Sequence, residues 1–185
     1  MTTGHVFMAQ SLDGFVARAD HRLDWLTSIP THGDDHGYAA FTATVDGIVM
    51  GRGSYNNVLS FGEWPYTKPV IVMSKSLTQR DVPETLTGKV RVTDLEPAPL
   101  MKMLADEGWS RAYIDGGLVV QSFIREGLVQ DMVLTVAPVM LGEGKRMFGP
   151  WGGDVGLELV ASTTFKSGMV QLKYRLPASN PEPGA

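Results

Sequence analysis

Short apolar runs that recur along the chain are the feature that most limits how it can fold. Five such runs lie in the first two-thirds of the sequence, and most of them lack alternating polar residues. A strand buried on both faces has no side turned to solvent, so such runs are typical of a parallel sheet covered by helices. The runs are residues 5–9, 48–50, 70–73, 89–92 and 112–114. They predict an α/β fold.

Helical spacing separates several of these runs, with apolar residues three or four positions apart on one face. We expect one helix to begin at Asp34 or Asp35, either of which would cap it, and to end at Gly47. Two further helices should end at Gly108 and Gly127. The inward-facing residues are, helix by helix, Tyr38, Phe41 and Val45, then Leu100, Met103 and Leu104, then Val120, Phe123 and Ile124.

The last third of the chain is rich in β-type residues. Residues 157–165 and 169–176 flank Lys166-Ser-Gly168, a pattern typical of a hairpin. The second strand alternates in polarity, which predicts one face in solvent and one buried face. The polar series is Met169, Gln171, Lys173 and Arg175, and the apolar series is Val170, Leu172, Tyr174 and Leu176.

Together these elements predict a three-layer α/β domain. Its sheet would be mixed, mainly parallel and twisted, with about eight strands, which is at the large end of the usual range. Helices would flank the sheet, and an antiparallel hairpin would close it at the C-terminus. We expect one domain over residues 1–176. Residues 177–185 contain three prolines and no periodicity, which predicts a disordered tail.

Composition excludes several functional classes. The chain has no cysteine, so it has neither disulfides nor thiolate nucleophiles nor cysteine-bound metals, which fits a reducing cytoplasm. The formal net charge is −4 and the basic residues are scattered, unlike a nucleic-acid-binding surface. No apolar run is long enough to span a bilayer. We expect a cytoplasmic protein that binds a small molecule, with a homodimer as a further expectation.

Glycines follow the second apolar run, at Gly51-Arg52-Gly53. Ligands of open α/β sheets bind at such strand ends, where small residues let a phosphate approach the backbone. The guanidinium of Arg52 would suit a phosphate monoester. Asn56 takes the third glycine position of a Gly-x-Gly-x-x-Gly fingerprint, which disfavours a standard Rossmann unit. The alternative is a tight turn with Arg52 in solvent.

Two more glycine-rich segments follow later strands. Asp115-Gly116-Gly117-Leu118 joins a strand to a helix, and its amides would suit a pyrophosphate. Leu141-Gly-Glu-Gly144 suggests a sharp loop within reach of a ligand. Taken singly, each is equally well read as an ordinary turn.

The order and spacing of these segments resemble the dihydrofolate reductase superfamily, and most closely its riboflavin-biosynthesis reductase branch. The resemblance spans roughly residues 5–176. The matching segments are residues 8–17, 49–52, 72–75, 115–117, 127–131 and 138–148.

The resemblance implies that NADPH lies extended across the C-terminal edge of the sheet. Arg52, Ser74 and Lys75 match positions that hold the adenosine 2′-phosphate, and Gly116 and Gly117 match the pyrophosphate turn. Further matches complete the expected cofactor site: Gly51 and Gly53 in the first turn, Asp115 and Leu118 beside the second, and Ala9, Phe15 and Val16 around the nicotinamide.

The resemblance to the riboflavin branch implies hydride transfer to a heterocyclic, pyrimidine-like substrate. Dihydrofolate reductases carry an acid early in the helix after the mobile loop, but Asp34 and Asp35 do not fall on that position. Asp13 is our candidate for a polar catalytic group near the nicotinamide; its alternative role is to stabilise the loop at Gly14. A side chain at Gly117 would collide with bound cofactor and leave stability nearly unchanged.

Two alternative functions remain. One is a true dihydrofolate reductase, and the other is a nucleotide-binding module without turnover, because binding residues do not reveal catalysis. His32 and His36 are spaced to bind a metal on a helix, but Gly33 and Gly37 disfavour that helix, so no metal site is expected. Trp25 and Trp64 would either line a flat substrate or anchor loops.

Overall fold

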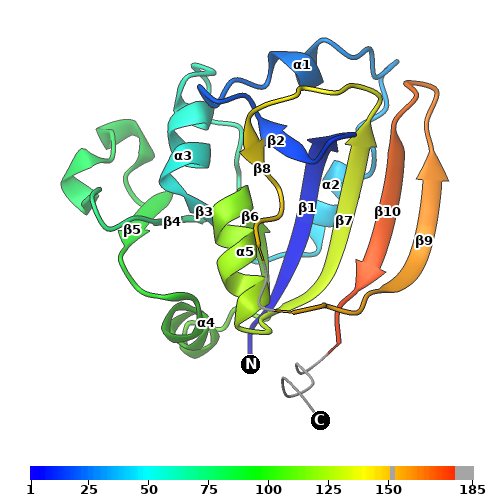
Figure 1. Ribbon diagram of the computed structural model, residues 1–185. Helices are drawn as coiled ribbons and strands as arrows, with labels where there is room; N and C mark the ends of the chain where they lie inside the picture. Colours follow the sequence, from blue (N-terminus) through cyan, green and yellow to red (C-terminus); the bar gives the residue numbers. More distant parts are fainter. Residues whose placement is uncertain (151–152, 178–185) are drawn as a thin grey trace.

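An eight-stranded sheet forms the centre of the molecule (Figure 1). The computed structural model describes residues 1–150 and 153–177. The strand order is β5-β4-β3-β6-β1-β7-β10-β9, and β10 is antiparallel to both of its neighbours while the other pairs are parallel. The predicted mixed, mainly parallel α/β sheet with a C-terminal hairpin is confirmed. Its strands are β1 Thr3–Ser11, β3 Gly47–Gly51, β4 Val70–Met73, β5 Val90–Thr93, β6 Arg111–Asp115, β7 Val129–Ala137, β9 Glu158–Thr164 and β10 Val170–Arg175.

Helices cover the two faces of this sheet (Figure 1). On the near face, α4 (Pro97–Asp106) and α5 (Gly117–Arg125) bury Leu100, Leu104 and Phe123 completely. On the far face lies α2 (Tyr38–Ala43), whose Phe41 packs with Phe7 and Tyr113. The remaining helical elements are α1 (Asp24–Thr27), α3 (Arg52–Leu59) and the 3-10 turns η1 (Gln79–Asp81) and η2 (Glu84–Leu86). Among the described residues no helix is long and apolar enough to cross a bilayer.

A second, two-stranded sheet lies above the C-terminal edge of the main sheet. It pairs β2 (Phe15–Ala17) with β8 (Lys145–Arg146) in antiparallel fashion. The amide of Met147 donates to the carbonyl of Gly14 at 2.9 Å, and Gln121 Nε2 of α5 donates to the carbonyl of Met147 at 3.1 Å. The loops after β1 and β7 are thus tied to each other and to α5.

The helix after the first loop is shorter than expected. It runs from Tyr38 to Ala43 instead of from Asp34 or Asp35 to Gly47. Its N-cap residue is Gly37 and not Asp34 or Asp35, but the Asp35 carboxylate accepts hydrogen bonds from the amides of Gly37 and Ala39 at 2.9 and 2.8 Å. Gly37 itself has φ +82°, so the helical conformation begins only after it.

The polarity alternation of β10 is only partly realised. Met169, expected in solvent, is 3% exposed, whereas Val170, expected to be buried, is 36% exposed. Leu176 is buried as predicted. Of the predicted tail at 177–185, only Pro177 belongs to the described residues.

Candidate functional site

Arg52 and residues 74–76 meet where β3 and β4 end. Arg52 begins α3, and its Nη1 donates to Ser76 Oγ at 2.6 Å. Ser74 Oγ lies 3.4 Å from Ser76 Oγ. We call Arg52, Ser74 and Ser76 the arginine–serine cluster. A guanidinium beside two hydroxyls is suited to a phosphate monoester. Ser76 was missed by the sequence reasoning, although it lies one residue beyond the predicted Ser74-Lys75 pair.

Lys75 points toward an acidic partner. Its Nζ lies 2.7 Å from Glu96 Oε1, and this hydrogen bond raises the pKa of the Lys75 ammonium. Both side chains are well exposed, so the pair contributes little to stability. The ammonium is therefore charged but shared with a carboxylate, which leaves Arg52 as the stronger anion ligand of this region.

The N-termini of α3 and α5 lie side by side at the same edge. Gly51 caps α3 and Gly116 caps α5. A Cβ on Gly116 would lie 2.7 Å from Ser54 Oγ, and one on Gly51 would lie 3.0 Å from a Val119 methyl. Helix N-termini present amide donors and the positive end of the helix dipole. Two of them together favour an anionic group such as a diphosphate.

Gly117 is required by packing within the protein. A Cβ on Gly117 would lie 2.5 Å from the carbonyl oxygen of Arg146 and 3.5 Å from a Val16 methyl. This geometry opposes the expectation that a side chain at Gly117 would leave stability nearly unchanged, because that side chain would meet the backbone of β8. Leu118, by contrast, is 81% exposed at the first turn of α5.

Asp115 ends β6 on the far face of the sheet. Although the residue is only partly buried, its carboxyl group is enclosed by protein. Tyr113 Oη lies 3.3 Å from Asp115 Oδ1 and donates to the carbonyl of Phe7 at 2.8 Å. Burial raises the pKa of Asp115, outweighing the hydrogen bonds from Ser54 and Tyr113 that favour its charged form. Asp115 therefore retains its proton to a higher pH than an ordinary aspartate.

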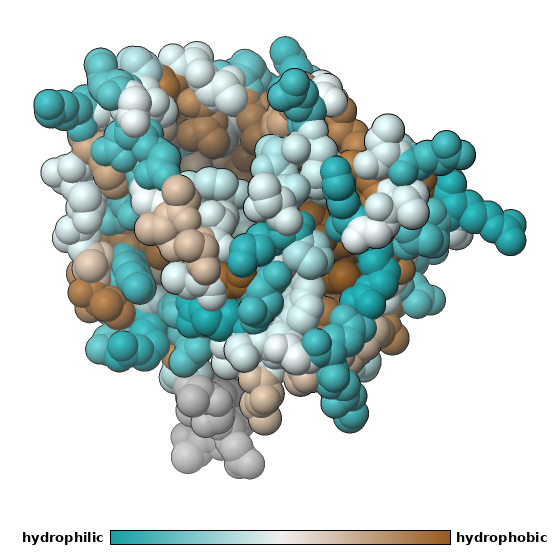
Figure 2. Space-filling model, turned by 180° about the vertical axis from the view of Figure 1, so that it is seen from behind, coloured by the Kyte–Doolittle hydropathy of each residue, from teal (hydrophilic) through white to brown (hydrophobic). Residues whose placement is uncertain are grey.

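Aromatic side chains gather on the same side of the sheet, in the core cluster that contains Tyr113. Phe7 contacts Tyr38 edge-on with ring centroids 5.6 Å apart, and Trp64 contacts Tyr66 in the same way at 5.3 Å. Such surroundings suit a flat, largely apolar ligand. Figure 2 shows this side of the molecule, where hydrophobic surface lies in a hollow in the upper part of a mostly polar face. Trp64 thus packs against the same core cluster as Tyr113, whereas Trp25 is 4% exposed and packs in a separate core.

Three phenols interact electrostatically with Asp115. Burial, and secondarily the nearby Asp115, raises the pKa of Tyr38 to about 12. The same causes raise the pKa of Tyr66 and Tyr113 further. All three therefore remain neutral at physiological pH. Tyr66 was missed because it lies in a loop with no motif around it.

Asp13 joins two loops instead of facing an open site. It accepts hydrogen bonds from Ser11 Oγ at 2.6 Å and from the amides of Leu141 and Gly142 at 3.0 and 2.7 Å. The Ser11 hydrogen bond, with those from Gly142 and Leu141, lowers the pKa of Asp13 to about 2. Such a carboxylate is ionised at neutral pH and cannot donate a proton. The loop-stabilising alternative therefore describes Asp13 better than a catalytic one.

The three residues expected around the nicotinamide occupy different environments. Ala9 lies near the C-terminal end of β1, opposite Thr135 of β7, and is half-buried. Phe15 is 4% exposed, with the Arg146 guanidinium 4.7 Å above its ring. Val16 is half-buried and packs against the core near Gly117. Phe15 thus anchors the small sheet, and Ala9 and Val16 keep some exposed surface at the strand ends. Gly53, in the first turn of α3, lies beneath the ring of His21.

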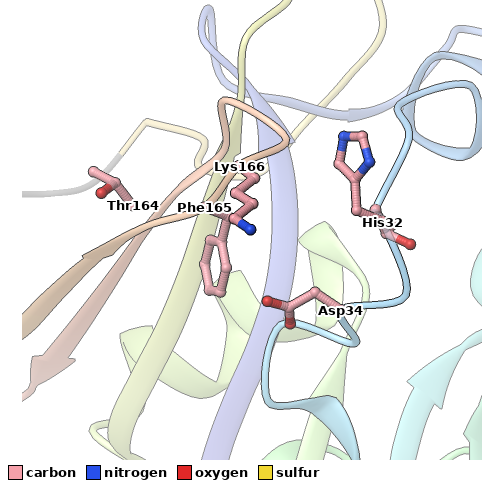
Figure 3. Close-up of a pocket in the computed structure, with 6 residues that line it drawn as sticks. His32, Asp34, Thr164, Phe165 and Lys166 are labelled. Carbon is pink, nitrogen blue, oxygen red and sulfur yellow. The ribbon is translucent and has the colours of Figure 1, made fainter.

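The histidine-rich loop lies beside a separate cavity. Figure 3 shows His32 and Asp34 on one wall, facing Phe165 and Lys166 of the C-terminal hairpin. The cavity measures about 300 Å³. His36 hydrogen-bonds with Ser167 Oγ at 3.3 Å and packs against Phe165. No group of three or more potential metal ligands occurs among the described residues.

Comparison with known proteins identifies the family. The model of the RibD C-terminal domain matches residues 2–171. The chain belongs to the RibD C-terminal domain family. It is 31% identical over 173 residues to the uncharacterized protein YwjB of Bacillus subtilis (strain 168), covering 91% of this chain and 95% of YwjB. YyaP of the same organism, also uncharacterized, is 29% identical over 175 residues, covering 90% of this chain and 91% of YyaP.

Solved structures agree with this assignment. A Shewanella sp. PV-4 protein provisionally assigned to riboflavin biosynthesis superposes with a TM-score of 0.89 and 36% identity, covering 95% of this chain and 99% of its own. The deaminase/reductase of Thermotoga maritima superposes with a TM-score of 0.73 at 12% identity. That match covers 95% of this chain and 57% of the Thermotoga protein, and it shows the fold alone. The RibD C-terminal family is typically a reductase family.

Proposed function

We propose that this protein is an NADPH-dependent reductase that transfers a hydride to a small, flat, pyrimidine-like heterocycle. The family membership supports a reductase. The observation that carries the proposal is the enclosed carboxyl group of Asp115, whose pKa burial raises, beside two converging helix N-termini. An anion site and an acid with a raised pKa thus share one sheet edge.

The residues present fit NADPH. The arginine–serine cluster offers a guanidinium and hydroxyls for the 2′-phosphate, and the N-termini of α3 and α5 offer amides for the diphosphate. When bound, NADPH supplies the hydride. The protein fixes the distance between cofactor and substrate and the face of the substrate that receives the hydride.

The acid that we assign to the reaction lies on the far face of the sheet. Burial raises the pKa of Asp115, and Tyr113 Oη lies 3.3 Å from its carboxyl group. Tyr38 and Tyr66 interact electrostatically with this carboxyl group, and both phenols remain neutral at physiological pH. We assign Asp115 to the polar edge of the heterocycle, where a proton is needed as hydride arrives.

Folate is not the substrate that this arrangement favours. A pterin reductase needs an acid in the helix that follows the first loop, but Asp35 uses both carboxylate oxygens on the amides of Gly37 and Ala39. These bonds lower the pKa of Asp35, so it is ionised at neutral pH. The proposed acid is Asp115, on a different element.

The proposal is tested by NADPH binding and by NADPH oxidation with pterins, ribosylaminopyrimidines and small carbonyl compounds. Asp115→Asn should bind NADPH normally but lose turnover about 10²–10⁴-fold, the usual contribution of a positioned acid. Asp106→Asn is the matched control, since Asp106 lies in an exposed pair with Lys102 on α4. In the wild type, kcat/KM should fall as pH rises through the raised pKa of Asp115.

Two outcomes would contradict the proposal. Tight NADPH binding without turnover on any of these substrates would favour a nucleotide-binding module. Full activity of Asp115→Asn would remove Asp115 from the reaction.

A further inference from the structure

Two buried hydrogen-bond donors on the far face of the sheet lack an acceptor within the protein. Tyr55 is 2% exposed and Trp64 is half-buried. Neither Tyr55 Oη nor Trp64 Nε1 has a hydrogen-bond partner in the part of the chain that the structure describes. Burial raises the pKa of Tyr55, so its phenol keeps its proton at physiological pH. Because a buried donor without an acceptor destabilises a protein, these two groups are suited to an acceptor that comes from outside the chain.

The two donors belong to one continuous group of rings. Tyr55 of α3 contacts Trp64 edge-on with ring centroids 6.1 Å apart, and Trp64 contacts Tyr66 in the same way at 5.3 Å. Tyr55 is part of the core cluster that contains Tyr113, and Trp64 and Tyr66 pack against that cluster. The unpaired donors therefore lie on the same face of the sheet as the candidate acid.

This group of rings is connected to Asp115 from both of its ends. Ser54, which precedes Tyr55, hydrogen-bonds with the Asp115 carboxyl group. At the other end, Tyr66 interacts electrostatically with the same carboxyl group. A flat ligand that places one edge at Asp115 would therefore have the donors of Tyr55 and Trp64 beside it.

The loop that carries Trp64 is held mainly by its side chains. Its two ends are fixed, because the amide of Gly62 donates to the carbonyl of Leu59 and the amide of Ile48 donates to the carbonyl of Pro69. Between them, residues 63–68 make no backbone–backbone hydrogen bond with any described residue. Segments with few backbone hydrogen bonds open at a low free-energy cost. Outward movement of this loop would expose the two donors to a ligand.

We propose that Tyr55 and Trp64 are specificity-determining residues, which donate hydrogen bonds to carbonyl oxygens of the substrate heterocycle when residues 63–68 open to admit it. The inference rests on the proposed reductase function and deepens it. The substrate is then a ring that carries carbonyl groups, such as a pyrimidinedione.

The chemistry of the two donors selects this class of ligand. An indole N–H donates and cannot accept, and both donors are uncharged. Among aromatic rings they favour a neutral acceptor over an anion, because burial of a charge without a counter-charge is costly. A ring without carbonyl oxygens would leave the buried donors unpaired, and sites of this kind reject such analogues strongly.

Thermal unfolding of the ligand-free protein gives the first test. Tyr55→Phe removes an unpaired hydroxyl, so its Tm should equal or exceed that of the wild type. Tyr113→Phe is the matched comparison: Tyr113 Oη donates to the carbonyl of Phe7 at 2.8 Å, so the same substitution should lower Tm. A fall in Tm for Tyr55→Phe as large as that for Tyr113→Phe would overturn the proposal. It would show that the Tyr55 hydroxyl is already satisfied, for example by a buried water.

The second test is ligand-observed NMR titration of the full chain. The probes are 6-aminouracil and 2-aminopyrimidine, which has a ring and an amino group but no carbonyl oxygen. The wild type should prefer 6-aminouracil. Tyr55→Phe and Trp64→Phe should each weaken its binding about five- to hundredfold and leave 2-aminopyrimidine binding unchanged. Trp25→Phe is the control, because Trp25 Nε1 is also buried and unpaired among the described residues but lies in a separate core.

Three titration results would overturn the proposal. They are a wild type without preference for 6-aminouracil, unchanged affinity in both Tyr55→Phe and Trp64→Phe, and an equal loss in Trp25→Phe. Tyr55→Phe alone decides the question if circular dichroism shows that Trp64→Phe does not fold. Neither test involves NADPH, so failure of this inference is distinguishable from failure of the proposed function, which NADPH binding and oxidation report.

Discussion

A methyl group added at Gly117 tests how the edge of the sheet is built. In the structure, a Cβ at this position would lie 2.5 Å from the carbonyl oxygen of Arg146. That carbonyl belongs to β8, whose pairing with β2 holds the two loops together. The backbone cannot rotate away as a flexible side chain would, so Gly117→Ala must displace β8 or the start of α5.

The expected cost follows from overpacking. An extra methylene in a packed site costs about 1–3 kcal/mol. In a domain of 150–250 residues each kcal/mol lowers Tm by about 2–4 °C, so Tm should fall by roughly 2–12 °C. Because the clash lies within the protein, the loss should be present without any cofactor.

Differential scanning fluorimetry of the cofactor-free protein measures this directly. Gly156→Ala is the control, since Gly156 has no heavy atom within 4 Å of its Cβ position and no positive φ, and its Tm should stay near that of the wild type. An unchanged Tm in Gly117→Ala combined with lost NADPH binding would refute the packing argument. It would show that the space at Gly117 is reserved for the ligand.

Four further predictions concern charged groups. Arg52→Ala should weaken NADPH binding about ten- to hundredfold and leave NADH binding unchanged, whereas the control Arg80→Ala should change neither. Calorimetry measures both affinities. Equal losses for the two cofactors would mean that Arg52 supports the fold or binds the diphosphate instead. The folded protein binds a proton at Asp115 more tightly than the unfolded chain does, because its pKa is raised in the fold. The Tm of the wild type should therefore fall relative to that of Asp115→Asn as pH rises through this pKa. Plots of Tm against pH that run parallel for the two proteins would contradict this. The hydrogen bonds that lower the pKa of Asp13 to about 2 stabilise the fold above about pH 4, and this stabilisation is lost as pH falls toward 2. Asp13→Asn should therefore have a lower Tm than the wild type at pH 7 and a similar Tm in acid. Dihydrofolate turnover should be slow, and Asp35→Asn should lower Tm; rapid turnover abolished by Asp35→Asn without unfolding would make the protein a dihydrofolate reductase.

The sequence alone determined the α/β architecture and the anion-binding end of the candidate site. Both depend on local signals: uninterrupted apolar runs indicate buried parallel strands, and a glycine after a strand indicates a turn into a helix. Arg52 and Ser74 follow such runs directly, so their position at one sheet edge could be predicted. The short α2 was mispredicted, because Gly37, with φ +82°, delays the start of the helical conformation to Tyr38, later than apolar spacing suggested.

Only the tertiary structure decided the roles of the two acids. Asp13 and Leu141 are 128 residues apart in sequence, and their contact exists because the loops after β1 and β7 pair above the sheet. Asp115 looks like a turn residue in sequence, but the strand order β3-β6-β1 and the loop carrying Tyr66 enclose its carboxyl group. A pKa depends on which groups surround a carboxyl in space, and spacing along the chain does not contain that information.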